Sequence, residues 1–166
     1  MALIDPMPAG RRAPAAVRIQ REAFDAGAEG AALSRGRTDV GAVVTFVGLC
    51  RDDDGTLAAL ELEHYPGMAE EEMARVVREA EARWPLMGVT AIHRFGRIAP
   101  GEPIVLVAVA AAHRAEAFAA AEMLMDFLKT RAPFWKRAVH TDGAEGEWVE
   151  AKAGDDAQAA RWGAAR

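Results

Sequence analysis

The segment from Ala115 to Ala132 constrains the fold most, because its apolar residues have the spacing of one long helix. That spacing predicts a single buried face, and the helix is expected to end at Pro133, which lacks a backbone N–H and disfavours helical angles at the residue before it. The apolar run Ile104 to Ala111 just before it predicts a strand. The residues of the helix stripe are Phe118, Ala121, Met125 and Leu128.

Positive charge gathers at the end of this helix, although the formal net charge of the chain is −5. Lys129 is placed at the margin of the buried face, and Lys136 follows Pro133, so it comes from a turn or a strand start. Two lysines from different local structures can converge on one anionic small molecule. The other interpretation is a basic helix end that only offsets the helix dipole. The cluster is LKTRAPFWKR, residues 128–137, with Arg131 and Arg137 as its remaining cations.

The rest of the chain alternates strand and helix patterns, which indicates an α+β fold class. We expect a single domain in which a mixed or antiparallel sheet is packed by two main helices. Residues 40–47 are predicted to be a buried strand, joined by the acidic loop Asp52 to Gly55 to the next strand of a hairpin. The predicted strands are residues 17–20, 40–47, 57–65, 89–95 and 104–111, and the predicted helices are 25–33, 68–84 and 115–132.

The two ends of the chain differ in composition from its middle. Residues 1–15 contain three prolines and Gly10 and are predicted to be a disordered N-terminal segment. Residues 154–166 are rich in alanine and are predicted to be a weakly ordered C-terminal tail. Residues 16–153 are therefore expected to form the one folded domain.

Composition excludes several classes of function. The acidic balance without an extended basic face argues against nucleic acid as a partner. One cysteine permits no internal disulfide and suits a reducing, cytoplasmic location. The longest apolar run, residues 104–112, is too short to cross a membrane. The four histidines show no close pairing, and His93 fits a hydrogen-bonded core residue, so we predict no metal site.

Several blocks of the sequence resemble those of one family, in that family's order. They are GAVVTFVGLCR (41–51), LELEHYPGM (60–68), RWPL (83–86), IHRFGRIAPGE (92–102), AHRAEAF (112–118), LKTRAPFWKR (128–137) and EWVEAK (147–152). The chain resembles the large, catalytic subunit of molybdopterin synthase over roughly residues 17–162. The resemblance implies an α/β-hammerhead-like fold.

The resemblance also implies a reaction. Enzymes of this family take sulfur from the C-terminal Gly-Gly thiocarboxylate of a small ubiquitin-like sulfur-carrier subunit. They insert two sulfurs into cyclic pyranopterin monophosphate, which yields the dithiolene of molybdopterin. The expected protein has no prosthetic group and forms the homodimer core of a heterotetramer with the carrier.

The site residues follow from the same resemblance, position by position. Lys129 and Lys136 are the expected catalytic residues, which stabilise charge and move protons at the thiocarboxylate and the pterin. Four basic residues are expected to bind the anionic substrate, together with two residues from the block 41–51. These substrate-binding residues are Arg51, His113, Arg114, Arg137, Cys50 and Leu49, and the expected groove for the carrier tail is formed by Phe134, Trp135 and Arg131.

Two other functions stay open at this point. One is a non-catalytic binding module for a ubiquitin-like tail, and the other is a sulfurtransferase that uses Cys50 as a persulfide carrier. The chain also departs from the family pattern. Asp52 to Asp54 follow Arg51 where relatives commonly carry Asn or His, Pro103 precedes the strand at Ile104, and Ala138 stands where an acidic residue is frequent.

Overall fold

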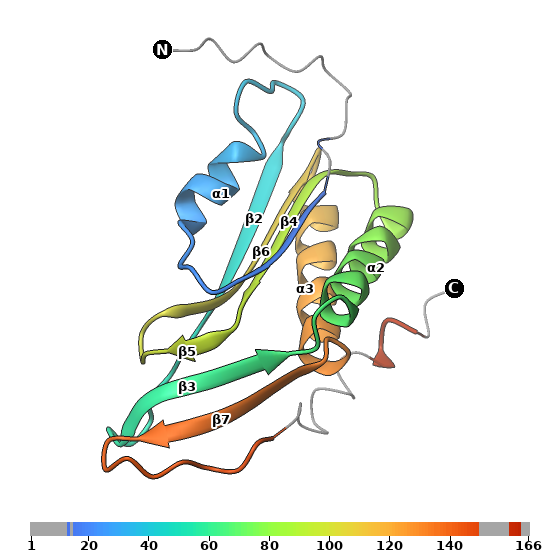
Figure 1. The fold of residues 1–166 in the computed structure, drawn as a ribbon. Helices are drawn as coiled ribbons and strands as arrows, with labels where there is room; N and C mark the ends of the chain where they lie inside the picture. The colour runs from blue at the N-terminus through green and yellow to red at the C-terminus, as the bar shows by residue number, and fades with distance from the viewer. Residues whose placement is uncertain (1–12, 14, 150–159, 164–166) are drawn as a thin grey trace.

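The computed structural model describes residues 13, 15–149 and 160–163, and within them the chain forms seven strands and three helices. The strands make a four-stranded and a three-stranded sheet, and the helices pack on the larger one (Figure 1). This confirms the α+β class with two main helices, α2 and α3, and adds a second sheet. The elements are β1 Ala16–Gln20, α1 Ala26–Ala32, β2 Ala42–Leu49, β3 Leu57–His64, α2 Met68–Arg83, β4 Leu86–Arg94, β5 Gly96–Ile98, β6 Pro103–Ala111, α3 Arg114–Thr130 and β7 Phe134–His140.

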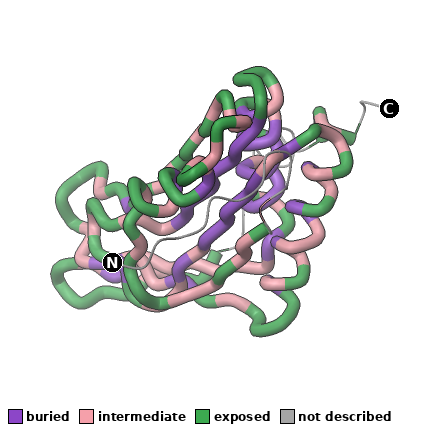
Figure 2. The backbone as a smooth tube through the Cα atoms, turned by 90° about the horizontal axis from the view of Figure 1, so that it is seen from above, coloured by how far each residue is buried: buried purple, intermediate pink, exposed green. Residues whose placement is uncertain are grey.

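Strand β6 lies inside the four-stranded sheet, whose order is β1-β4-β6-β2. It pairs antiparallel with β4 and β2, whereas β1 runs parallel to β4. Val105, Val107 and Val109 join the apolar cluster under α2 and α3, while Leu106 and Ala108 join the cluster on the α1 side. Because both faces of β6 are covered, the strand is apolar throughout, and Figure 2 shows the buried residues concentrated along the inner strands.

The ends of the two main helices follow from local chemistry. Gly67, before α2, has a φ of 83°, which glycine adopts without strain, and its N–H donates to the Glu70 carboxylate at 2.7 Å. Helix α3 ends at Thr130 with Arg131 as its C-cap. It therefore stops before Pro133, as the sequence predicts.

The three-stranded sheet has the order β5-β3-β7 and is antiparallel. Its register places Leu62 of β3 opposite Lys136 of β7. Residues 144–149 run back along the outer edge of β7, where Val149 and Lys136 exchange backbone hydrogen bonds of 3.0 and 2.8 Å. This sheet crosses below the larger one, near the C-terminal end of α3 (Figure 1).

Two expectations about the strands are wrong. Residues 52–55 do not close a hairpin, because β2 pairs with β6 and β3 pairs with β7, so this loop connects the two sheets. Strand β2 is not buried: it lies at the edge of its sheet and has no fully buried residue. An apolar, β-branched run predicts a strand but does not distinguish an edge from a centre.

The predicted stripe of α3 is only partly buried. Ala121, Met125 and Leu128 are in the core, whereas Phe118 is 61% exposed. Ala117, one residue earlier, is fully buried instead. A small alanine lets the helix approach the sheet, so the largest apolar side chain was a misleading guide to the buried face.

The predicted N-terminal segment 1–15 lies almost wholly outside the described residues, as does most of the predicted tail 154–166. The described tail residues contact the main helices. The Trp162 indole N–H donates to Asp126 of α3 at 2.7 Å, and the Trp162 carbonyl accepts from Arg83 of α2 at 2.6 Å.

Candidate active site

One cavity of about 620 Å³ brings six of the predicted site residues together. It lies where the last turn of α3 and the end of β2 meet β3 and β7. Apolar side chains, among them Phe46, Ile104 and Met125, form much of its wall. The predicted residues that line it are Leu49, Cys50, Arg51, Lys129, Phe134 and Lys136.

The two lysines reach the cavity from different elements. Lys129 comes from the last turn of α3, and Lys136 is the third residue of β7. Within the described part of the chain, no carboxylate lies within ion-pair distance of either amine. The cavity therefore offers two ammonium groups to a ligand without first breaking an ion pair to a described residue.

Lysine is scarce in this chain. The 20 basic residues include only three lysines, Lys129, Lys136 and Lys152, and the third lies outside the described residues. A lysine ammonium can lose a proton, whereas an arginine guanidinium stays charged. Both described lysines line the cavity, and the scarcity of lysine can be read from the sequence alone.

Arg51 stands at the cavity mouth with its side chain 81% exposed. Its guanidinium contacts the Asp53 carboxylate through Nε at 2.7 Å and through a second nitrogen at 3.0 Å. Such an exposed pair contributes only about 0–1 kcal/mol, so a phosphate group can replace Asp53. Asp52 and Asp54 accept hydrogen bonds from backbone N–H groups of the same loop and its end.

Cys50 is buried beside the cavity and is 3% exposed. Burial has the largest effect on the pKa of the Cys50 thiol and raises it, a backbone hydrogen bond at Leu60 lowers it by less, and the carboxylates of Asp52 and Glu102 raise it slightly further. The thiol is therefore protonated near neutral pH. Its neighbour Leu49 is exposed at the cavity wall.

Arg137 and Trp135 do not line the cavity. Side chains alternate along β7, and Phe134 and Lys136 point to the cavity face. Trp135 and Arg137 therefore point to the opposite face. There Arg137 contacts Glu61 and Glu145, each at 2.6 Å, and the hydrogen bond to Glu61 raises its pKa.

Arg131 also lies apart from the cavity lining. It is the C-cap of α3, and its guanidinium sits 4.4 Å from the centre of the Phe127 ring. It can meet a partner at the surface, but it does not form the wall of the cavity.

His113 and Arg114 lie at the opposite end of α3 from Lys129. Lys129 follows Arg114 by 15 positions, which correspond to roughly 22 Å along the helix axis. Both side chains are on exposed residues. One chain therefore does not bring these two cations to the lysine cavity.

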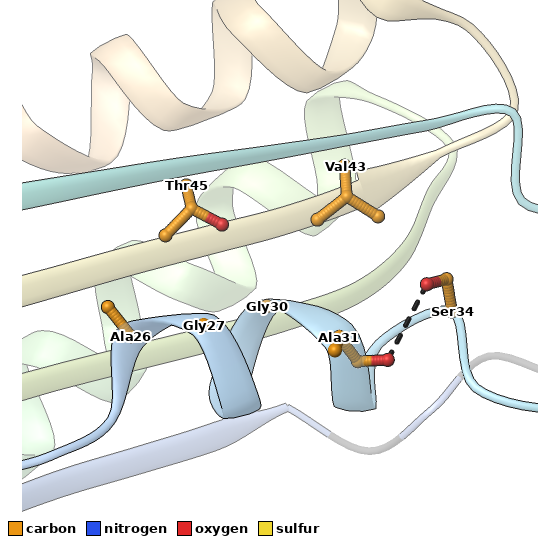
Figure 3. A pocket seen from close by; sticks show the side chains of 7 residues that line it. All are labelled: Ala26, Gly27, Gly30, Ala31, Ser34, Val43 and Thr45. Carbon is orange, nitrogen blue, oxygen red and sulfur yellow. Dashed lines mark hydrogen bonds between the residues drawn. The ribbon is translucent and has the colours of Figure 1, made fainter.

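A second, smaller hollow of about 370 Å³ lies between α1 and β2 (Figure 3). Its wall has no charged side chain and none of the predicted site residues. The two elements approach closely, because a Cβ on Gly30 would lie 2.7 Å from the Thr45 hydroxyl. This hollow is a packing feature lined by Ala26, Gly27, Gly30, Ala31, Ser34, Val43 and Thr45.

Two other kinds of site are not found in residues 13, 15–149 and 160–163. They contain no cluster of three or more His, Cys, Asp or Glu side chains suited to a metal ion. They also contain no helix that is long and apolar enough to span a membrane.

Comparisons with known proteins show the family to which the chain belongs. The family model described as MoaE protein matches residues 19–131. The molybdopterin synthase catalytic subunit of Mesorhizobium japonicum is 65% identical over 146 residues, which cover 88% of this chain and 92% of that protein.

Solved structures are similar over nearly the whole fold. The molybdopterin biosynthesis MoaE protein from Burkholderia ambifaria has a TM-score of 0.78 and 49% identity, covering 92% of this chain and 100% of that one. The molybdopterin synthase from Staphylococcus aureus has a TM-score of 0.71 and 29% identity, covering 79% and 94%. The chain therefore belongs to the MoaE family of molybdopterin synthase catalytic subunits.

Proposed function

We propose that the lysine cavity converts cyclic pyranopterin monophosphate to molybdopterin by inserting two dithiolene sulfurs. The observation that carries this proposal is the meeting of Lys129 and Lys136, from α3 and β7, in one cavity. The apolar side chains in its wall strengthen the interaction of the two amines with a developing negative charge. The reaction needs no resident prosthetic group, since both sulfurs come from the carrier.

The two lysines are assigned different roles in this proposal. Lys129 contacts the thiocarboxylate carbon or its oxygen, and Lys136 contacts the pterin. Arg51, at the mouth, binds the substrate phosphate once Asp53 is displaced. Leu49 and Cys50 pack beside the substrate without reacting.

The sulfur donor is a small ubiquitin-like protein that ends in a Gly-Gly thiocarboxylate. A relative named as a catalytic subunit implies a second kind of subunit, which supports such a partner. An extended tail without side chains fits a cavity whose wall includes Phe134 and Met125. Arg131 and Trp135 contact the body of the carrier outside the cavity.

A second copy of the chain completes the site. The edge strand β2 and helix α3 expose Phe46 and Phe118, at 40% and 61%, as a dimer surface would. Across a two-fold interface, His113 and Arg114 of one copy can reach the cavity of the other, which they cannot do within one chain. The resulting enzyme has two large and two small subunits, and its chemistry suits the cytoplasm.

The alternatives are less well supported. A Cys50 persulfide carrier needs an accessible thiolate, but Cys50 is buried and its pKa is raised. A binding module needs only positive charge, which arginine provides as well as lysine. It therefore does not explain why positions 129 and 136 both carry lysine in a chain that is rich in arginine.

The test is a reconstituted reaction of the purified chain, thiocarboxylated carrier and cyclic pyranopterin monophosphate. Molybdopterin is measured as its fluorescent oxidation product. We expect product with the natural chain and a loss of at least about 100-fold with Lys129→Arg or Lys136→Arg, because arginine does not exchange a proton. Carrier binding is measured in parallel, and full turnover by either arginine variant would favour the binding-module interpretation of the lysines.

A further inference from the structure

The cavity wall contains a histidine to which the proposed reaction assigns no role. His93 lies on β4 of the four-stranded sheet and lines the cavity. Its ring stacks on Phe134 of β7, with centroids 3.7 Å apart and ring planes 17° from parallel. His64 of β3 lies 6.0 Å from Phe134 and is tilted. The His93–Phe134 stack therefore joins the two sheets at the cavity.

The His93 ring has a fixed orientation and is neutral at pH 7. Its Nδ1 lies 2.8 Å from the carbonyl oxygen of Arg94, and because a carbonyl only accepts, Nδ1 carries the hydrogen. Removal of solvent lowers the pKa of His93 to about 4. Such a ring is too weak a base for proton transfer at neutral pH, but it stacks on an aromatic ring without burying a charge.

Phe134 lies between the two lysines along the chain. Lys129 precedes it by five residues, and Lys136 follows by two on the same face of β7. The Phe134 N–H donates to the Ala132 carbonyl at 2.8 Å, which tightens the turn from α3 into β7. The Phe134 ring is therefore anchored within the short segment that connects Lys129 to Lys136.

We propose that His93 is a positioning residue, which holds Phe134 by stacking and so sets the separation of the Lys129 and Lys136 amines. The importance of that separation rests on the proposed function of the lysine pair. A displacement of about 1 Å in a catalytic group is enough to cost about 100-fold in rate, so a side chain without contact to the reacting atoms can control turnover.

Two variants separate stacking from hydrogen bonding. His93→Phe keeps a flat ring and loses the Nδ1–H donor, whereas His93→Gln keeps a donor and loses the aromatic ring. We expect His93→Phe to retain kcat within about threefold, and His93→Gln to lose at least about tenfold in kcat with KM for the pterin changed less than about threefold. His64→Gln is the matched control, because the His64 ring is 6.0 Å from Phe134 and does not stack on it. Its kcat is expected to stay within about threefold of the natural value.

A second readout needs no turnover. A short amine-to-amine cross-linker, difluorodinitrobenzene, joins Lys129 to Lys136, and the joined peptides are counted by mass spectrometry after digestion. We expect an unchanged yield in His93→Phe and a yield at least about threefold lower in His93→Gln. If the natural chain makes no product, the proposed function fails, and the cross-link yield alone decides the role of His93.

Clear results would overturn the role of His93. One is a His93→Gln protein with unchanged kcat and cross-link yield. Another is a His93→Phe protein that folds, as its thermal unfolding shows, yet loses turnover and cross-linking, because stacking alone would then be insufficient. This second result decides the matter even where His93→Gln does not fold.

Discussion

At the scale of single residues, charge is used in two ways in this molecule. Arg75 on α2 contacts Glu72 and Glu79 at 2.7 and 3.1 Å, an arrangement that stabilises a helix surface and does no chemistry. Lys129 and Lys136 have no such partner among the described residues and face a cavity instead. Ion pairing with a carboxylate therefore distinguishes structural cations such as Arg75 from cations that are available to a substrate.

The neutral state of His93 predicts how stability depends on pH. Its pKa of about 4 in the fold lies below the ordinary value of 6.5, so the unfolded chain binds a proton that the folded one does not. The stabilisation is complete above pH 6.5 and is lost as pH falls toward 4, by up to about 3 kcal/mol. Denaturant unfolding of the natural chain and His93→Phe at pH 7 and pH 4.5 measures it. Equal losses in both proteins would show that other groups cause the acid sensitivity.

At the scale of elements, Arg137 links the segment 144–149 to β7. It contacts Glu61 and Glu145 at 2.6 Å each and lies 4.8 Å from the centre of the Trp148 ring. Val149, at the end of this segment, forms part of the cavity wall. Arg137 therefore supports the cavity from its outer side and does not line it.

Arg137→Gln is expected to loosen this segment. Hydrogen exchange at the amides of Gly146 and Val149 should quicken by at least about tenfold, because opening the segment no longer breaks an ion pair. Arg97→Gln is the control, since Arg97 lies 3.9 Å from Glu61 and is 59% exposed. Equal exchange in both variants would show that the backbone hydrogen bonds alone hold the segment.

Most elements could be predicted from the sequence, because apolar periodicity and prolines act locally. The helix ending before Pro133 is one example. The division into two sheets could not be predicted, because the pairing of β3 with β7 joins residues at least 70 positions apart. No local pattern in the loop 52–55 indicates whether it turns back into the same sheet or crosses to another.

At the scale of the whole molecule, the predicted substrate-binding residues fall into three groups. Leu49, Cys50 and Arg51 line the cavity, Arg137 points to the other face of β7, and His113 and Arg114 lie roughly 22 Å away at the far end of α3. Sequence similarity identifies the positions of site residues but not the subunit whose cavity they enter. The separation of His113 and Arg114 from the cavity follows only from the length and direction of α3 in the structure.

Mixed dimers test whether the second copy completes the site. Arg114→Ala and Lys129→Ala chains are each expected to be nearly inactive, whereas a co-expressed mixture regains up to about half of the natural activity per mixed dimer. In such a dimer, one cavity carries both defects and the other carries none. Activity of the mixture no higher than that of the two separate variants would place Arg114 in the cavity of its own chain.

The most direct measurement compares two variants in the reconstituted reaction. Lys129→Ala should make no detectable molybdopterin while it folds and binds the carrier, and Cys50→Ser should retain activity, because the buried thiol takes no part in the reaction. The opposite pattern, an active Lys129→Ala and an inactive but folded Cys50→Ser, would contradict the lysine mechanism and place the chemistry on sulfur of the chain itself.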